Sequence, residues 1–429
     1  MRTIAVVGAS LAGLSSARAL RSQGFDGRLV IIGDEIHRPY DRPPLSKDFL
    51  AGKVGVGDLA LELDDEDLDA EWLLGVRAAG LDLTARSVVL ANGSRVRADG
   101  LVIATGASAR TIPGAEGLAG VHTLRTLDDA VALKDALQPG RRLVVIGAGF
   151  IGAETAATAH LLGLDVTVVE AMATPLAGPL GAEMGAVVAQ LHADNGVALL
   201  CGTGVRRFTG SGQVDGVELE DGRVLPADLV LVGVGARPNV DWLRDSGLEL
   251  GNGVLCDAGG LTSAPGVVAV GDCAAWYDRR LGHHDRVEHW SGASERPKRA
   301  VASLLSGDSA GQDSIPAYFW SDQYDARIQF AGNAQGADAV TIEAGDPALR
   351  SFLAVYRREE EPVAVLGMNQ VRLFTRWRRA LNAGPVPPCP ESTPVELPGD
   401  CSRGAQRCTV PRLTVARSLP RRVPGGTSG

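Results

Sequence analysis

The sequence predicts an α/β protein built from two similar strand–turn–helix–strand units, followed by a smaller α+β domain. Each unit has a glycine-rich turn behind an apolar strand, and each ends on a further apolar strand that breaks at glycine. From residue 317 onward the composition shifts toward aromatics and arginine, and the run 352–356 suggests an antiparallel sheet. A chain of 429 residues is long enough for two or three separate cores.

The first unit opens with an apolar strand at 3–7, followed by the turn Gly8-Ala9-Ser10-Leu11-Ala12-Gly13. A helix-like stretch, a strand at 29–32 and the acid Asp34 come next, with Glu35 as a nearby alternative. This order is typical of a Rossmann-like dinucleotide site, where glycines let the backbone approach a pyrophosphate at a helix N-terminus. The acid accepts hydrogen bonds from a ribose diol. We therefore expect Gly8, Ser10 and Gly13 to bind a dinucleotide together with the acid.

The second unit repeats this order with the turn Gly147-Ala148-Gly149-Phe150-Ile151-Gly152, strands at 143–146 and 166–169, and the acid Glu170. Two complete units suggest two dinucleotides held face to face, as when electrons pass from a nicotinamide to a flavin. Glu170 would bond the 2′-hydroxyl of NADH and repel the 2′-phosphate of NADPH. The following residues 171–173 contain no arginine, so NADH is favoured. The predicted nicotinamide-dinucleotide residues are Gly147, Gly149, Ile151, Gly152, Glu170 and Gly235.

Apolar strands expected at 101–106 and 228–235 close the two units, and the run 262–272 ends in Gly-Asp as the chain returns to the first domain. The predicted domains are therefore 1–112 with 243–316 for the first dinucleotide, 113–242 for the second, and 317–382 for the C-terminal domain. A helix is expected from Thr126 to Leu137. Residues 383–429 lose apolar periodicity, which predicts a disordered, mildly basic tail, with a partner-binding arm as the alternative.

Composition excludes several classes of protein. A formal net charge of −9 argues against non-specific nucleic-acid binding, which needs a basic face. No stretch approaches about 20 uninterrupted apolar residues, so nothing is expected to span a membrane. The apolar start runs straight into a glycine turn rather than a cleavage site, so a signal peptide is not expected and the protein is predicted to be cytoplasmic.

The six cysteines form no C-x-x-C pair, so no metal site is expected. We expect them to be small buried hydrophobes and tail residues. They are Cys201, Cys256, Cys273, Cys389, Cys401 and Cys408.

With these features in place, the chain resembles the FAD-dependent, NADH-using ferredoxin and rubredoxin reductases that serve cytochrome P450s and Rieske oxygenases. The resemblance covers about residues 2–380 and rests most on two blocks, Arg42-Pro43-Pro44-Leu45-Ser46-Lys47 and Tyr318-Phe319-Trp320-Ser321-Asp322-Gln323. It implies the glutathione-reductase fold, with an FAD domain, an inserted NAD domain and a C-terminal domain. The first glycine turn departs from the family pattern, because Ser10 stands where glycine is common; serine is small enough to keep the FAD assignment.

The resemblance implies further FAD contacts, with Asp272 bonding the ribityl chain and Ala78 as a backbone contact. The full set implied is Gly8, Ser10, Ala12, Gly13, Asp34, Glu35, Arg42, Lys47, Ala78, Thr105, Gly106, Arg125, Gly271, Asp272 and Trp290.

Three residues are implied in catalysis. The family places Lys47 at the isoalloxazine, where a cation offsets the charge that develops on reduction. Glu154 resembles its counterpart and the carboxylate that meets the nicotinamide amide; a solvated helix residue is the alternative. Trp320 is expected against the isoalloxazine, with a core aromatic as the alternative. His289 is either a flavin-side contact or a structural histidine.

The region around Lys47 contains no cysteine, so no thiol can relay electrons there. The implied reaction carries electrons from NADH through FAD to a small acidic ferredoxin of the [2Fe-2S] or another type, or to a rubredoxin. The alternatives are an NADH oxidase or small-molecule reductase of the same fold, and a slow-turnover flavin-bound regulatory protein. A monomer or homodimer is expected. A basic docking face is expected for the acidic partner, at Arg296, Lys298, Arg299 and Arg327.

Overall fold

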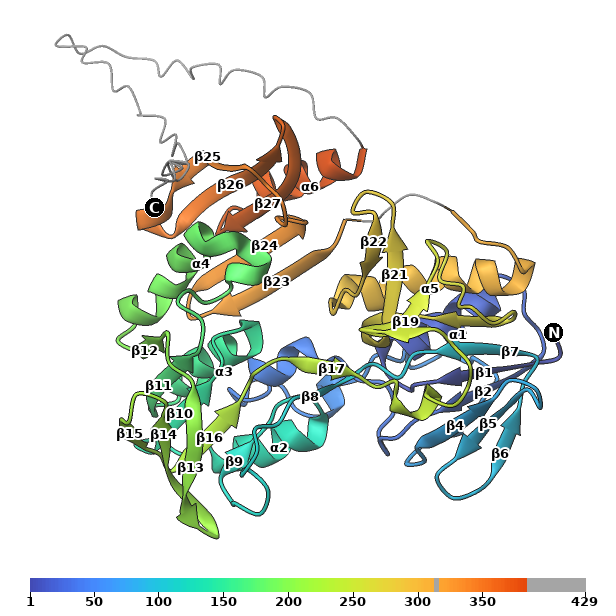
Figure 1. Cartoon of the computed structure of the whole chain (residues 1–429), viewed down its shortest axis with the longest axis horizontal. Helices are drawn as coiled ribbons and strands as arrows, with labels where there is room; N and C mark the ends of the chain where they lie inside the picture. Colours follow the sequence, from blue (N-terminus) through green and yellow to red (C-terminus); the bar gives the residue numbers. More distant parts are fainter. Residues whose placement is uncertain (312–315, 384–429) are drawn as a thin grey trace, which may run out of the picture.

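The computed structural model describes residues 1–311 and 316–383. Its first unit is a five-stranded parallel sheet in the order β20-β7-β1-β2-β3. Helices α1 (Leu11–Ser22) and α5 (Trp290–Ser306) pack against each other beside this sheet (Figure 1). The strands are β1 (Thr3–Val7), β2 (Arg28–Ile32), β3 (Ala70–Leu73), β7 (Gly100–Ile103) and β20 (Val267–Ala269).

The second unit is also a five-stranded parallel sheet, in the order β12-β11-β10-β16-β9. Its central strands are buried almost completely, as expected for a parallel sheet that helices cover. The strands are β9 (Val121–His122), β10 (Arg142–Ile146), β11 (Asp165–Glu170), β12 (Ala198–Cys201) and β16 (Leu229–Val232); the helices are α2 (Leu127–Ala136), α3 (Phe150–Leu161) and α4 (Ala177–Asp194).

Two crossing strands join the units: β8 (Ala107–Ala109) pairs with β17 (Ala236–Pro238) in an antiparallel connection visible between the two halves in Figure 1. Asn239 accepts hydrogen bonds from two residues in and next to β8. Its backbone oxygen accepts from Thr105 Oγ1 at 2.7 Å, and its Oδ1 accepts from Ser108 Oγ at 2.7 Å. The crossing therefore fixes how the first unit meets the second.

Smaller antiparallel sheets decorate both units. The first carries β4 (Ala78–Asp82), β5 (Ser87–Leu90) and β6 (Arg95–Arg97), and the second carries β13 (Val205–Ser211), β14 (Gln213–Leu219) and β15 (Val224–Pro226). A mixed sheet joins β18 (Leu250–Gly251), β19 (Gly253–Cys256), β21 (Ala274–Asp278) and β22 (His283–Asp285).

The C-terminal domain is an antiparallel sheet in the order β23-β24-β27-β26-β25, with α6 (Val371–Ala383) against it. In β26, alternate residues serve two cores: Phe352 packs in the core shared with α4, whereas Leu353 packs in the core with Phe374 of α6. The strand is buried on both faces for this reason. The strands are β23 (Tyr318–Gln323), β24 (Ala326–Gly332), β25 (Ala339–Asp346), β26 (Ser351–Arg358) and β27 (Glu361–Met368).

The fold class predicted from the sequence is confirmed. The helix expected from Thr126 begins there, since Thr126 Oγ1 caps the backbone N–H of Asp129 and the Asp129 carboxylate returns the bond. The closing strands are shorter than expected, because glycine at positive φ, +65° at Gly106 and +96° at Gly235, turns the chain after each. The predicted tail lies outside the described residues from 384 onward, and Ala383 is the last residue of α6.

Candidate functional site

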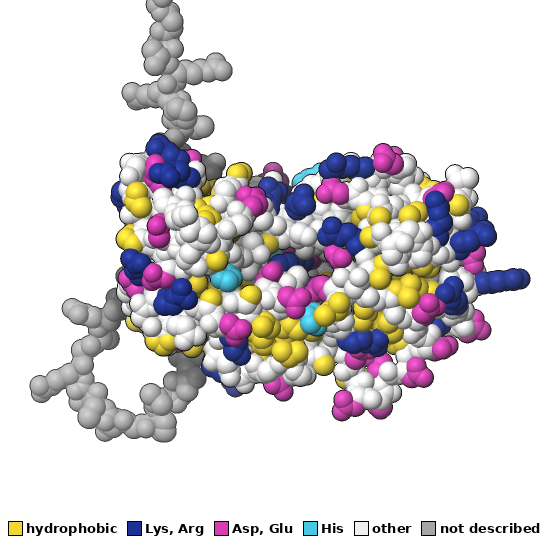
Figure 2. Space-filling model, turned by 90° about the horizontal axis from the view of Figure 1, so that it is seen from below, with side chains coloured by type: hydrophobic (Ala, Val, Ile, Leu, Met, Phe, Trp, Pro, Cys, Tyr) yellow, Lys and Arg dark blue, Asp and Glu magenta, His cyan; other side chains and the backbone are white. Residues whose placement is uncertain are grey.

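A cavity of about 650 Å³ lies where the two units and the C-terminal sheet meet. Figure 2 shows the molecule hollowed between its two halves, with acidic and basic side chains at the edges. The first glycine turn, the loops after β2 and β7, the start of α2, the start of α3 and the start of β23 all contribute to the wall. Of the predicted site residues, the cavity is lined by Gly8, Ser10, Ala12, Asp34, Glu35, Arg42, Lys47, Ala78, Thr105, Gly106, Arg125, Ile151, Glu154, Gly271, Asp272, Trp290 and Trp320.

The first glycine turn brings backbone close to the cavity. A Cβ on Gly8 would lie 1.9 Å from the carbonyl oxygen of Ala104, and one on Gly13 would lie 1.8 Å from that of Gly8. Gly13 therefore packs against the backbone of the turn and does not line the cavity. Ser10 has extended backbone with φ −117°, so serine fits without strain where glycine is common in the family. Its side chain makes no cap bond to α1, which leaves N–H groups at the helix start for a ligand.

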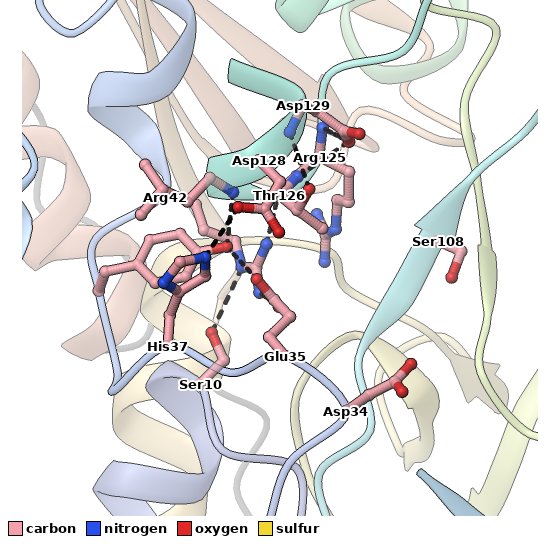
Figure 3. A network of polar contacts seen from close by, with 12 residues as sticks. Ser10, Asp34, Glu35, His37, Arg42, Ser108, Arg125, Thr126, Asp128 and Asp129 are labelled. Carbon is pink, nitrogen blue, oxygen red and sulfur yellow. Dashed lines mark hydrogen bonds and ion pairs between the residues drawn. The ribbon is translucent and has the colours of Figure 1, made fainter. Parts of the chain in front are cut away.

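Glu35 and Arg42 form the polar network drawn in Figure 3. Arg42 donates to Glu35 Oε1 at 2.6 Å, to the backbone oxygen of Arg125 at 2.5 Å and to Ser10 Oγ at 3.3 Å. Tyr40 donates to Glu35 Oε2 and accepts from the backbone N–H of Leu127 at 2.9 Å. Glu35 is therefore bound by its own loop.

Asp34 lies apart from this network in Figure 3 and pairs with Arg77 at 3.1 Å. It is more than half exposed, so exchanging Arg77 for a ribose costs little. On the other side of the cavity, Asp272 pairs with Arg125 at 2.5 Å, and both side chains are largely buried. The two acids thus stand at different depths of the same cavity.

Lys47 and Glu154 form an ion pair at 2.6 Å between the units. Lys47 follows the 3₁₀ helix Pro43–Ser46, and Glu154 lies one turn into α3. The side chains are only 16% and 5% exposed, so the pair is shielded from solvent. Lys47 Nζ also donates to the backbone oxygen of Pro43 at 2.8 Å. A charge held this firmly can act on a bound group without reorganising.

Aromatic side chains form one wall of the cavity. Trp290 and Trp320 meet edge to face at 6.1 Å between ring centroids, and Trp290 donates to Asp41 Oδ1 at 2.8 Å. Burial raises the pKa of Asp41. His289 packs against Phe319 at 4.8 Å, and burial lowers the pKa of His289 to about 4, so its ring is neutral at pH 7. Its Nδ1 is buried with no partner among the described residues.

The second glycine turn holds Glu170 from its own backbone. Glu170 Oε2 accepts from the N–H of Ala148 at 2.9 Å and Oε1 accepts from the N–H of Met172 at 2.8 Å. A Cβ on Gly147 would lie 2.4 Å from the carbonyl oxygen of Gly233, and one on Gly152 would lie 2.1 Å from that of Gly147. Gly147, Gly149, Gly152, Glu170 and Gly235 do not line the cavity; Ile151 and Glu154 connect this turn to it.

The cavity fits FAD in size and in chemistry. Its volume lies within the range of cofactor sites. Arg42 donates to Ser10 at the start of α1, where close backbone approach and a helix N-terminus suit a pyrophosphate, and Arg125 lines the same cavity. In this fit, the carboxylates of Asp34 and Asp272 would accept hydrogen bonds from the ribose and the ribityl chain, and Lys47 would place a cation beside the ring system.

Comparison with known proteins decides the family. The family model "pyridine nucleotide-disulphide oxidoreductase" matches residues 2–297. The chain belongs to this family. A second model, "reductase C-terminal", matches residues 318–392 of this pyridine nucleotide-disulphide oxidoreductase.

Relatives and solved structures agree with this assignment. The chain is 40% identical over 383 residues to the benzene 1,2-dioxygenase system ferredoxin–NAD(+) reductase subunit of Pseudomonas putida, covering 89% of this chain and 92% of that protein. It is 38% identical over 347 residues to rhodocoxin reductase of Rhodococcus erythropolis, covering 79% and 80%. Putidaredoxin reductase, solved in a covalent complex with putidaredoxin, matches with a TM-score of 0.85 at 32% identity, covering 89% of this chain and 93% of that one. A ferredoxin reductase from Rhodopseudomonas palustris matches with a TM-score of 0.85 at 36% identity, covering 90% and 96%.

These findings confirm the resemblance and the expectation of an oxidoreductase that uses FAD and NADH. The individual site residues stay predictions. Sequence reasoning missed Ser46 and Ser321, which both donate to Glu154, and Asn239 at the crossing. The two serines stand inside the blocks that carried the resemblance, yet nothing in the sequence pairs either of them with Glu154.

The expected basic docking face does not form at Arg296. Its guanidinium lies over the ring of Trp276 at 5.2 Å, and burial lowers its pKa. Lys298 is exposed, and Arg327 lies 3.6 Å from Asp322. Arg299 is half-buried on the same helix as Arg296.

Of the cysteines within the described ranges, Cys256 and Cys273 are buried, whereas Cys201 is exposed, contrary to the expectation for it. The other three lie outside the described residues. No cysteine lines the cavity among the residues described. Across residues 1–311 and 316–383, no helix is long and apolar enough to cross a membrane.

Proposed function

We propose that this chain oxidises NADH and reduces a small acidic [2Fe-2S] ferredoxin, which in turn feeds an oxygenase. The observation that carries the proposal is a cavity that joins both dinucleotide units and has no thiol in its described wall. Because no described cysteine lies there to take electrons from this cavity, an acceptor outside the protein is favoured. The relatives that belong to oxygenase systems support the same conclusion. We further propose that the protein acts in the cytoplasm, as a monomer or homodimer.

The residues of the cavity divide the work. When bound, FAD accepts a hydride from NADH and can release the two electrons one at a time. Lys47 holds a positive charge beside the ring system, and Glu154 holds Lys47 in place. Glu170, fixed by two backbone N–H groups, selects NADH at the ribose. Phe150 and Phe319, with ring centroids 4.5 Å apart, give the cavity an apolar wall that would keep water from the bound groups.

We propose that the ferredoxin docks on α6. Arg372, Arg376 and Arg379 are exposed on this helix, and their spacing of four and three places them on one face. A protein with a net charge of −9 needs such a local basic face to attract an acidic partner. An aromatic series leads from this helix to the cavity. Arg378 lies over the Tyr318 ring at 3.9 Å, and Tyr318 stacks on Trp320 at 5.9 Å.

The proposal is tested by anaerobic reduction with NADH, followed by mixing with a [2Fe-2S] ferredoxin, a rubredoxin, oxygen or a quinone. We expect the ferredoxin to be reduced fastest. Faster transfer to oxygen or quinone than to either carrier would instead identify an oxidase or small-molecule reductase.

Charge reversal tests the docking face. We expect Arg376→Glu to raise the KM for ferredoxin about threefold to tenfold, most at low salt, without changing reduction by NADH. Arg97→Glu is the matched control, because Arg97 is exposed on β6 at the far end of the first unit (Figure 1). Equal effects of both reversals would exclude α6 as the docking face.

A further inference from the structure

The carboxylate of Glu154 receives hydrogen bonds from three parts of the chain. Its Oε2 accepts from Ser46 Oγ at 2.5 Å and from Lys47 Nζ at 2.6 Å, both in the loop of the first unit. Its Oε1 accepts from Ser321 Oγ at 2.7 Å, on β23 of the C-terminal sheet. Glu154 itself belongs to α3 of the second unit. One buried side chain thus joins all three domains.

We propose that Ser321 is a positioning residue for electron transfer: its hydroxyl fixes the Glu154 carboxylate and thereby fixes Lys47 at the cavity. This inference rests on the proposed function. Ser321 does not line the cavity and is fully buried, so it acts through Glu154 rather than on a bound group.

The direction of the Ser321 hydrogen is set by a neighbour. Gln323 Nε2 donates to Ser321 Oγ at 3.2 Å, and an amide nitrogen has no acceptor to offer in return. The hydroxyl therefore keeps its own hydrogen for Glu154. Gln323 is only 1% exposed, so water does not compete for this arrangement.

The two carboxylate oxygens of Glu154 accept different numbers of hydrogen bonds. Among the described contacts, Oε1 has Ser321 as its donor, whereas Oε2 has both Ser46 and Lys47. Loss of the Ser321 hydroxyl leaves one buried oxygen without a donor, which costs more than loss of one donor out of two. The carboxylate then turns to recover a partner, and Lys47 Nζ moves with it.

The test is a set of FAD-loaded, full-length variants. We expect Ser321→Ala to slow reduction by NADH about tenfold, as the loss of a hydrogen bond to a charged group does. Ser46→Ala should have a smaller effect. Ser303→Ala is the matched control, because Ser303 is equally buried but donates to the backbone oxygen of Gly259. FAD occupancy and the unfolding midpoint verify that each variant folds.

Two further readouts separate positioning from a structural role. We expect Ser321→Ala to change the absorption spectrum of the bound flavin and the pH profile of its reduction, and Ser303→Ala to change neither. In a Glu154→Ala background, Ser321→Ala should add less than twofold, because the group it orients is gone. An unchanged spectrum and rate, or the full tenfold effect in both backgrounds, would overturn the inference. Failure of the wild-type protein to reduce ferredoxin would count against the proposed function alone, since the spectrum and NADH reduction need no carrier.

Discussion

The two glycine turns of this protein have similar backbone geometry but different surroundings. In both, the first and last glycines leave no room for a Cβ, which would lie between 1.8 and 2.4 Å from a carbonyl oxygen. The third position is extended in both, with φ −117° at Ser10 and φ −71° at Gly149. A Cβ at Gly149 would meet nothing within 4 Å, which explains why the first turn tolerates serine there.

The surroundings of the two turns differ in how far they enclose a ligand. Around the first turn, Arg42, Arg125 and Asp272 close a cavity from loops that come from distant parts of the sequence. Around the second turn, Glu170 is held only by backbone N–H groups of its own unit in the described contacts. The glycine turns thus set the backbone that would approach a pyrophosphate, and we expect the enclosure around the first turn to hold its ligand longer.

The largest expected effect comes from adding a methyl group to the first glycine of each turn. Gly8→Ala should yield protein with less than a tenth of the FAD content of the wild type, because φ +126° and the Ala104 oxygen both forbid a side chain. Gly147→Ala should retain FAD but raise the KM for NADH at least tenfold. The ratio of flavin to protein absorbance and steady-state kinetics with ferricyanide measure the two effects.

Gly24→Ala controls for backbone strain alone. Gly24 also has positive φ, +86°, but its Cβ would meet nothing within 4 Å. It should lower stability by about 1 kcal/mol and leave FAD content unchanged. Full FAD content in Gly8→Ala would show that the first turn does not approach the cofactor.

The turns and the central strands of both parallel sheets could be predicted because they depend on local sequence: apolar strands, glycines at fixed spacing and an acid after each second strand. The contacts that enclose the cavity could not be predicted in the same way. The bond between Ser321 and Glu154 joins residues 167 positions apart, and the bond between Arg125 and Asp272 joins residues 147 apart. At Arg296, a prediction from local sequence was wrong because of a contact with a distant residue. Its helix was expected to present it to solvent, but the neighbouring Trp276 ring draws the guanidinium inward.

A smaller effect is expected at the acid of the second turn. Glu170→Gln removes the charge that we propose accepts from the ribose of NADH and repels the 2′-phosphate of NADPH. We expect kcat/KM for NADH to fall about tenfold and the preference for NADH over NADPH to fall about a hundredfold, with FAD content unchanged.

Asp165→Asn is the matched control for Glu170→Gln, because Asp165 is an exposed acid at the opposite end of β11. It should leave both kinetic values within twofold of the wild type. If Glu170→Gln keeps the full preference for NADH, the discrimination resides outside this strand.

The smallest expected effect concerns the elements against which the helices of each unit pack. The first unit packs α1 on α5, whereas α4 of the second unit rests on the C-terminal sheet, where His192 Nδ1 lies 2.8 Å from Tyr324 Oη. Burial lowers the pKa of His192 to about 4. The unfolded chain therefore binds this proton more readily than the folded protein, and the stability that neutral His192 provides is complete above pH 6.5 and is lost as the pH falls toward 4.

We expect the free energy of unfolding, measured in urea with excess FAD, to fall between pH 7 and pH 5 with about 2 kcal/mol of the loss due to His192. His192→Asn keeps a polar group opposite Tyr324 but cannot take up the proton, so its loss over this range should be smaller by that amount. His283→Asn, at an exposed histidine, should follow the wild type. Equal losses in all three proteins would mean that His192 takes up its proton as readily in the folded protein as in the unfolded chain, and that its neutral ring does not stabilise the contact of α4 with the C-terminal sheet.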